Sequence, residues 1–358
     1  MEASHFKKAG IVTILVVVIS IGCREFYLRS KGVSCSYDDN EALWAYKRAQ
    51  IYKESDATFF IGSSRIKFDI DIEIREQETA KKALQLALVG TSPQLVLKDL
   101  ADDNKFNGRL IIDGTEFILF SRDPADHESA KKTIEYYKKI TPAQEASFSI
   151  DYLLQSKFAF PESKKFSLKG LCDQLRVPER KGVFVFKGFP IGFEPTNSDR
   201  QNVMSEDFVR DTSRHREVKN ARIKFNAVSS APGIKGDSLQ HILKDIKNSI
   251  DKITGRGGQV LFIRPPSSGE AREAEKIAYP REQYRDKLLQ YTNTPGIYFE
   301  DYPEIASFEC PEWSHLSRQQ AVVYTTKIIE IIQTKKGRVF PRKTLTAYNQ
   351  TKPAYHGF

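Results

Sequence analysis

The sequence predicts an α/β protein built on a doubly wound, mostly parallel sheet. Short apolar runs that end in turn residues recur along the chain, and segments with helical spacing of apolar residues lie between them. Near-continuous apolar runs are typical of strands buried on both faces, as in a parallel sheet covered by helices on each side. The chain has 358 residues, 40% of them hydrophobic and 28% charged, which suits one large α/β domain with insertions or two smaller domains.

The first element is an uncharged apolar segment, GIVTILVVVISIGC (residues 10–23), which lies between Lys7-Lys8 and Arg24. As a helix this segment extends roughly 21 Å, less than the ~30 Å hydrocarbon core, so by itself it is a marginal span. Its position behind two lysines is typical of an export signal or signal anchor. We expect residues 1–30 to form a transmembrane signal anchor or a cleaved signal, with the bulk of the chain outside the cytoplasm.

Five apolar runs are the predicted strands, and residues 41–54 form a predicted helix that leads into the first of them. The runs are ATFFIG (57–62), KALQLALVG (82–90), RLIIDG (109–114), QVLFIR (259–264) and GIYFE (296–300). Each is short and is closed by turn residues, so they match buried strands better than helices.

Two later helices have recognisable ends. Apolar residues keep helical spacing over residues 239–253, with Asp237 as the expected N-cap and Gly255 as the expected stop. SRQQ (317–320) is a capping-box pattern, which predicts the start of a last helix that runs to about Gln333.

Residues 120–235, approximately, interrupt the alternation of strand and helix. They are polar and carry turn signals at three X-Pro pairs. We interpret them as a large insertion or cap within one α/β domain that covers residues 31–335. Residues 336–358 lose periodicity and are predicted to be a basic, flexible tail.

Charge and cysteine content restrict the partners. The formal net charge is +9, but no Lys/Arg stripe with interleaved aromatic residues is present, so we expect no nucleic-acid partner. The cysteines (Cys23, Cys35, Cys172 and Cys310) lack metal-ligand spacing, and no GxGxxG motif follows a strand, so we expect neither a metal nor another cofactor. One disulfide among the last three cysteines and free thiols are both compatible with the sequence.

The loops that follow the predicted strands are where chemistry is expected, because ligands of parallel sheets bind outside the carboxyl ends of the strands. Three of the five loops open with glycine: Gly62, Gly90 and Gly114. After the last strand, Glu312 and His315 are three residues apart. A serine nucleophile needs a neighbouring base, and that base needs an anion to fix its tautomer. His315 and Glu312 are candidates for these two roles, with a serine of the first loop as the nucleophile.

The order of these blocks resembles that of the SGNH (GDSL-like) hydrolase superfamily, whose fold is a flavodoxin-like three-layer sandwich. The resemblance implies that Ser64 of Gly62-Ser63-Ser64 is the nucleophile, with Ser63 where Asp is more usual. It implies His315 as the general base, oriented by Glu312, which replaces the family's Asp. The backbone N–H groups of Ser64 and Gly90 are the implied oxyanion donors.

The third block departs from the family pattern. In Gly114-Thr115-Glu116, Glu116 stands where the family has an asparagine that donates to the oxyanion. An ionised glutamate only accepts hydrogen bonds and would repel the developing charge. Either Thr115 or another group donates instead, or Glu116 is protonated, or the hydrolytic activity is altered or lost.

Four further side chains are possible substrate contacts at this edge: Arg65, Glu116, Arg264 and Trp313. Each has a structural alternative. Arg65 could pair with Asp69 or Asp71 on a solvated face, Arg264 could belong to a structural ion pair, and Trp313 could serve packing alone.

The resemblance thus implies a membrane-anchored or exported serine esterase or O-acyltransferase that acts on ester-linked acyl groups. By analogy with exported relatives, acylated envelope polysaccharides are the expected substrates. The alternative is a catalytically inactive SGNH-like envelope protein that uses the same cleft to bind glycan or a protein partner, and Glu116 is the residue that favours it.

Overall fold

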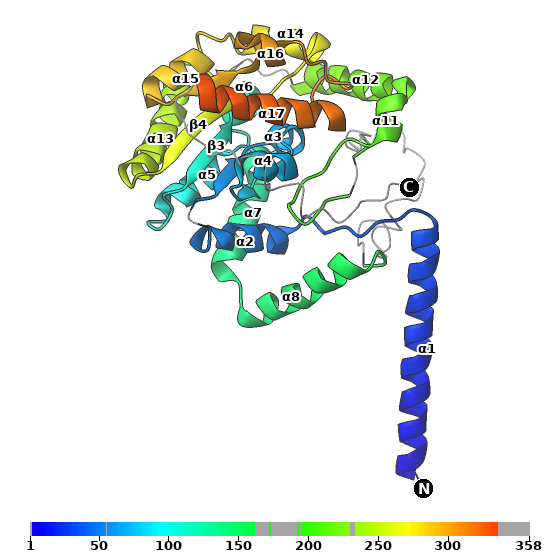
Figure 1. The fold of residues 1–358 in the computed structure, drawn as a ribbon. Helices are drawn as coiled ribbons and strands as arrows, with labels where there is room; N and C mark the ends of the chain where they lie inside the picture. Colours follow the sequence, from blue (N-terminus) through cyan, green and yellow to red (C-terminus); the bar gives the residue numbers. More distant parts are fainter. Residues whose placement is uncertain are drawn as a thin grey trace, which may run out of the picture.

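A computed structural model describes residues 2–54, 56–161, 172, 192–193, 195–229 and 233–335. Its centre is a five-stranded sheet in the order β2-β1-β3-β4-β5, and every neighbouring pair is parallel. Figure 1 shows β3 and β4 in the middle of the body, surrounded by helices. The strands are β1 (Thr58–Ile61), β2 (Ala83–Gln85), β3 (Arg109–Asp113), β4 (Gln259–Arg264) and β5 (Gly296–Tyr298). The α/β class, the parallel sheet and its five strands are therefore as predicted.

Helices cover both faces of the sheet because successive side chains of each strand point to opposite faces. Phe59 and Ile61 of β1 join the core under one set of helices, whereas Phe60 joins the core under the other. The first set is α2 (Glu41–Ala49), α5 (Gln94–Asp102), α7 (Ala125–Lys139), α13 (Gly236–Gly255) and α15 (Arg285–Thr292). The second set is α3 (Ser64–Asp69), α4 (Ile72–Thr79), α16 (Pro303–Ala306) and α17 (Arg318–Lys335).

The ends of α13 and α17 test the capping predictions. Ser317 Oγ accepts from Gln320 N at 3.3 Å and Gln320 Oε1 accepts from Ser317 N at 3.0 Å, so the predicted capping box is confirmed. Asp237 is not the N-cap of α13, because the helix already begins at Gly236, whose φ of +60° favours glycine. The predicted stop is correct, since Gly255 is the last residue of α13.

The strand order reverses between β1 and β3: the chain leaves β1 for β2 on one side and returns to β3 on the other. Such a reversal leaves a crevice at the carboxyl ends of the two strands, the usual ligand position in open α/β sheets. The loop Gly62–Ser64 follows β1 here, and Gly114-Thr115 follows β3, ahead of the short α6 (Glu116–Leu119). The sheet therefore brings the first and third predicted blocks together.

The segment between β3 and β4 is largely helical where it is described. It contains α8 (Pro142–Lys157), α11 (Glu206–Arg210) and α12 (Thr212–Ser229) besides α7 and α13. Ala130 of α7 is fully buried in the core, and α7 packs against α2 and α5 in the layer that covers the sheet. The remaining short elements are η1 (Gln50–Tyr52), α14 (Gly269–Ala278) and η2 (Phe299–Asp301). Residues 336–358, the predicted tail, lie outside the described part.

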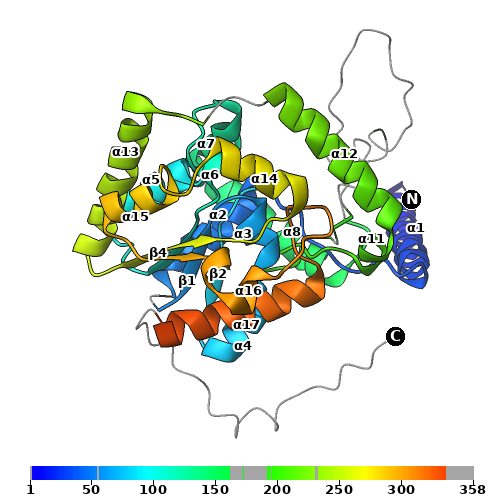
Figure 2. The same ribbon diagram turned by 90° about the horizontal axis from the view of Figure 1, so that it is seen from above.

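The N-terminal helix α1 (Glu2–Ser30) projects from the α/β body (Figures 1 and 2). Over His5–Ser30 it is long and apolar enough to cross a membrane, a property that it shares with signal sequences. Helical structure thus extends beyond the apolar segment 10–23, which by itself is a marginal span. The four cysteines are free thiols.

Candidate active site

The loop after β1 gives its two serines different environments. Gly62 adopts φ +151°, and a Cβ there would lie 2.2 Å from Asp113 Cβ, so only glycine lets the loop pass this close to β3. Ser63 is the N-cap of α3; its N–H and its hydroxyl both donate to Asp113 Oδ2, at 3.1 Å and 2.6 Å. Ser63 is buried and committed to this turn, whereas Ser64 is partly exposed.

Ser64, His315 and Glu312 form a continuous chain of hydrogen bonds. Ser64 Oγ lies 2.9 Å from His315 Nε2, and His315 Nδ1 lies 2.7 Å from Glu312 Oε1. Because a carboxylate can only accept, the proton of a neutral His315 lies on Nδ1, and Nε2 is left to accept the Ser64 proton. Residues 251 positions apart in the sequence thus meet with the spacing that a nucleophile and its general base require.

Glu312 is held from its far side by Arg222 of α12. The carboxylate has no exposed surface, and Oε2 accepts from Arg222 Nε at 2.7 Å and also from Nη2. Arg222 Nε also donates to the Glu312 carbonyl oxygen at 3.1 Å. Burial alone would raise the pKa of Glu312, but His315 and Arg222 outweigh this effect and lower the pKa below 4.5. Arg222 was missed in the sequence because it stands among many charges of a polar segment.

His315 is enclosed by aromatic rings. Phe68 and Phe193 contact it edge to face, with ring centroids 5.1 Å and 5.5 Å from the imidazole. Burial lowers the pKa of His315 from its usual 6.5, and Glu312 acts in the opposite direction without reversing the shift. The imidazole is therefore neutral at pH 7, the form that accepts a proton.

Asp69 and Arg65 both hold the loop that carries His315. Arg65 Nε donates to Ser314 Oγ at 3.2 Å. Asp69 Oδ1 accepts from Leu316 N at 2.9 Å, and the side chain is fully buried. Burial raises the pKa of Asp69 well above its usual 3.8. Arg65 forms no ion pair with Asp69 or Asp71, so that expectation is wrong. It is itself buried and pairs with Glu275 of α14 at 2.5 Å.

Glu275 joins Arg65 to a second buried arginine, Arg264 at the end of β4. Arg264 Nη2 lies 2.5 Å from Glu275 Oε2, and Arg264 Nε lies 3.0 Å from Glu116 Oε2. Arg272 Nη1 also lies 3.7 Å from Glu275 Oε2, so three arginines surround the two carboxylates beneath the site. Burial alone would raise the pKa of Glu275, but Arg65 and Arg264 lower it.

This network changes the reading of three predicted substrate contacts. Arg65, Glu116 and Arg264 are at most 3% exposed, and their charged groups face one another. Of the alternatives considered from the sequence, the structural ion pair is the one found for Arg264. The carboxylate of Glu116, which occupies the position expected for an oxyanion donor, is compensated by a guanidinium.

The predicted oxyanion donors differ in their availability. Ser64 N–H lies in the first turn of α3, where backbone N–H groups have no acceptor within the helix. Gly90 is exposed in the loop after β2, and this loop is joined to the Ser64 loop by the bond from Leu88 N to Gly62 O, 2.9 Å. Thr115 N–H is bonded to Asp113 Oδ1 at 2.9 Å, and the Thr115 hydroxyl is buried without a hydrogen-bond partner among the described residues.

Trp313 lies next to the catalytic candidates and packs against Gly269. A Cβ on Gly269 would lie 2.2 Å from Trp313 Nε1, so the indole occupies the space that a side chain would fill. Lys219 of α12 lies 5.3 Å from the centroid of the indole ring. Trp313 is partly exposed and adopts φ +72°, a backbone conformation that residues other than glycine rarely adopt.

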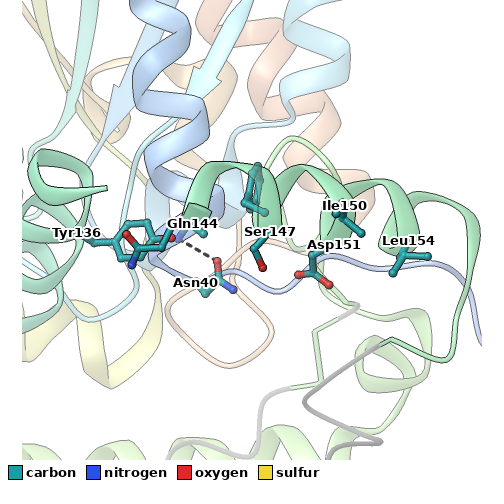
Figure 3. Close-up of a pocket in the computed structure, with 9 residues that line it drawn as sticks. Asn40, Tyr136, Gln144, Ser147, Ile150, Asp151 and Leu154 are labelled. Atoms are coloured by element: carbon teal, nitrogen blue, oxygen red, sulfur yellow. Dashed lines mark hydrogen bonds between the residues drawn. The ribbon is translucent and has the colours of Figure 1, made fainter. Parts of the chain in front are cut away.

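A hollow of about 450 Å³ lies elsewhere, between α8 and the start of α2 (Figure 3). None of its lining residues belongs to the Ser64 site, and its lining holds no serine–histidine pair. We therefore place the candidate active site at the hydrogen-bonded chain Ser64–His315–Glu312 and not at this hollow. Among the described residues, no group of three His, Cys, Asp or Glu side chains is placed to hold a metal ion.

No protein-family model matches the sequence, and a search of curated proteins finds no relative of the chain.

Proposed function

We propose that the protein is a serine esterase or O-acyltransferase of the SGNH type, with the flavodoxin-like topology of that superfamily. The observation that carries the proposal is the chain from Ser64 Oγ through His315 to Glu312, with distances of 2.9 Å and 2.7 Å, at the strand-order reversal. A structural serine needs neither a buried neutral histidine on its hydroxyl nor a carboxylate behind that histidine.

In the proposed reaction, Ser64 Oγ attacks the ester carbonyl carbon while His315 Nε2 takes the hydroxyl proton. The N–H groups of Ser64 and Gly90 donate to the oxyanion of the tetrahedral intermediate. The imidazolium then gives its proton to the leaving alkoxide, which leaves as the alcohol, and an acyl-Ser64 remains. Water or an acceptor hydroxyl, activated by His315 in turn, releases the acyl group and restores Ser64.

Glu312 keeps the Nδ1–H tautomer throughout the cycle and stabilises the imidazolium. We assign Arg222 a positioning role, because it occupies the second oxygen of the same carboxylate. Loss of one oxyanion donor costs about 10²–10³-fold in rate, so a site that has glutamate in place of asparagine can retain activity through its two backbone donors. The ion pair between Glu116 and Arg264 reduces the repulsion that an uncompensated carboxylate would exert.

The proposal extends to location and substrate. With α1 as an anchor, the α/β body would lie outside the cytoplasm, where ester-linked acyl groups of envelope polysaccharides are the substrates that we propose. The second candidate function is a non-catalytic envelope protein that binds glycan or a partner in the same cleft. The observation that favours it is Glu116, which leaves the third block without its usual side-chain donor.

The test is covalent labelling of the full chain in detergent with a fluorophosphonate probe, together with turnover of p-nitrophenyl acetate. We expect labelling of Ser64, with both signals lost in Ser64→Ala. Ser147→Ala removes an exposed serine of α8 and is the matched control, which keeps both signals. Absence of label and turnover in folded wild-type protein would favour the non-catalytic candidate, and full activity in Ser64→Ala would exclude this nucleophile.

A further inference from the structure

Helix α8 presents an apolar face away from the protein. On its inner side, Phe148 and Tyr152 stack on Tyr46 of α2, with ring centroids 5.4 Å and 5.3 Å away. On the opposite side, Ile150 and Leu153 are 63% and 60% exposed. Ala143, Ala146 and Leu154 share this outer stripe by helical spacing and are exposed as well. A surface helix in water normally turns polar residues outward, so an apolar outer stripe on α8 is unusual for a helix that faces water.

The carboxyl end of α8 is bonded to α1. Both carboxylate oxygens of Glu25 accept from Ala159 N, at 2.9 Å and 3.0 Å, and one also accepts from Phe160 N at 3.2 Å. Arg29 Nη2 donates to Lys157 O at 2.8 Å. Glu25 follows the uncharged segment 10–23 by two residues, roughly 3 Å along a helix. The end of α8 therefore lies at the level where α1 changes from apolar to polar.

The position of α8 relative to the α/β body also places this helix at the apolar-to-polar boundary of α1. In Figure 1, α8 lies beneath the α/β body, on the side toward which α1 extends. In Figure 2, which looks nearly along α1, α8 lies behind the body. Because the aromatic side of α8 faces α2, its apolar stripe faces away from the body. Figure 3 shows Ile150 and Leu154, with Ser147 and Asp151, along the flank of α8 that borders the hollow next to Asn40, so the outer stripe adjoins this hollow on one side.

We propose that α8 lies on the surface of the lipid bilayer, with Ile150, Leu153 and Leu154 inserted at the boundary between headgroups and acyl chains. A bilayer that encloses the apolar part of α1 places its surface close to Glu25, which is where α8 is attached. Lys157 and Phe158 stand at the same end of α8, the kinds of side chain that extend a charge to the headgroups or rest among them.

The lipid surface is the occupant that these observations favour. Apolar contact, rather than charge, carries the interaction, since α8 contains Glu145, Asp151 and Lys157 and is not basic. With α1 and α8 both in contact with the bilayer, the α/β body is held at one height and in one orientation. The inference rests on α1 being retained as a membrane anchor, and it is independent of the catalytic role of Ser64.

The test places a reporter on the outer stripe. Full-length Leu153→Trp protein is reconstituted in phosphatidylcholine vesicles that contain lipid brominated near the headgroup, and tryptophan quenching is compared with that of wild type. Ile277→Trp is the matched control, because Ile277 is 81% exposed on α14, at the far side of the body. The native Trp44 and Trp313 contribute equally to all three proteins.

We expect brominated lipid to quench the added tryptophan of Leu153→Trp and of a second variant, Ile150→Trp, but not that of Ile277→Trp. Equal quenching in all variants and wild type overturns the proposal. Shielding of the added tryptophan that grows with protein density, without quenching by brominated lipid, also overturns it and assigns the stripe to a second copy of the chain. Ile150 and Leu153 are each more than half exposed, so a tryptophan at either position does not disturb the core.

Discussion

Two hydrogen-bond donors converge on the Glu312 carboxylate, and this convergence predicts the effect of Glu312→Gln. Oε1 accepts from His315 Nδ1 at 2.7 Å, and Oε2 accepts from Arg222 Nε at 2.7 Å. Glutamine offers one acceptor oxygen and one donor NH2 group, whereas Arg222 can only donate. The amide oxygen therefore faces Arg222, and the NH2 group faces His315. Nδ1 must then accept, the imidazole proton moves to Nε2, and the ring can no longer accept the Ser64 proton.

The magnitude depends on how strongly Arg222 excludes the other amide orientation. In that orientation the amide NH2 group faces the Arg222 guanidinium, and neither donor finds an acceptor. The site is fully buried, so leaving these donors unpaired beside a charge costs about 3 kcal/mol. A bias of about 3 kcal/mol leaves roughly 1% of the molecules with the productive tautomer. Complete loss of that tautomer lowers kcat about 10⁴-fold in serine proteases. We therefore expect Glu312→Gln to lower the labelling rate by about 10²- to 10⁴-fold.

The assay is the second-order rate of fluorophosphonate labelling, measured with full chain in detergent at pH 7.5. Glu312→Gln combined with Arg222→Met is the decisive variant: without the guanidinium, the amide oxygen can turn to His315 Nδ1–H, and we expect at least about ten times the rate of Glu312→Gln alone. Arg222→Met by itself is the control for packing. A Glu312→Gln rate within tenfold of wild type, or a double variant no faster than the single one, would refute the reasoning.

Three further predictions concern the protein around this site. Because burial lowers the pKa of His315 from its usual 6.5, the labelling rate should fall on acidification with a midpoint below pH 6.5; a midpoint above 6.5 contradicts it. Glu116→Gln leaves the buried Arg264 with one carboxylate fewer and should lower the free energy of unfolding in urea by about 3 kcal/mol. The labelling rate per folded molecule of Glu116→Gln should stay within about tenfold of wild type. A larger rise in rate would mean that the Glu116 carboxylate destabilises the oxyanion in the native protein. Gly62→Ala should lower the thermal midpoint, because its Cβ would meet β3 at 2.2 Å, while Gly255→Ala, with open space around it, should not.

The parts of the fold that are encoded locally could be predicted from the sequence. The five apolar runs became the five strands because burial on both faces of a parallel sheet selects uninterrupted apolar residues. The capping box of α17 was also predictable, because both of its hydrogen bonds join residues 317 and 320, which are close in the sequence. Asp237 shows the limit of this approach: its residue type suits an N-cap, but the helix begins one residue earlier, at Gly236, and Lys235 occupies the N-cap position.

The meeting of Ser64, His315 and Glu312 was expected from the order of the sequence blocks, because parallel strands bring their following loops to one edge. The partners behind them were not. Arg222 reaches Glu312 from 90 positions away, and Arg65 reaches Glu275 from 210 positions away. In the sequence, these arginines look like any exposed arginine, since charge type carries no information about burial.

The sequence by itself thus determined the strands, the apolar N-terminal helix and the residue types of the candidate site, because periodicity and capping act over a few neighbouring residues. Only the tertiary structure decided which charges are buried against one another and which face of α8 is left without protein. Both outcomes depend on distant segments that meet in space: α12 and α14 bring Arg222 and Glu275 to the site, and α2 covers one side of α8 while its apolar stripe stays open beside α1.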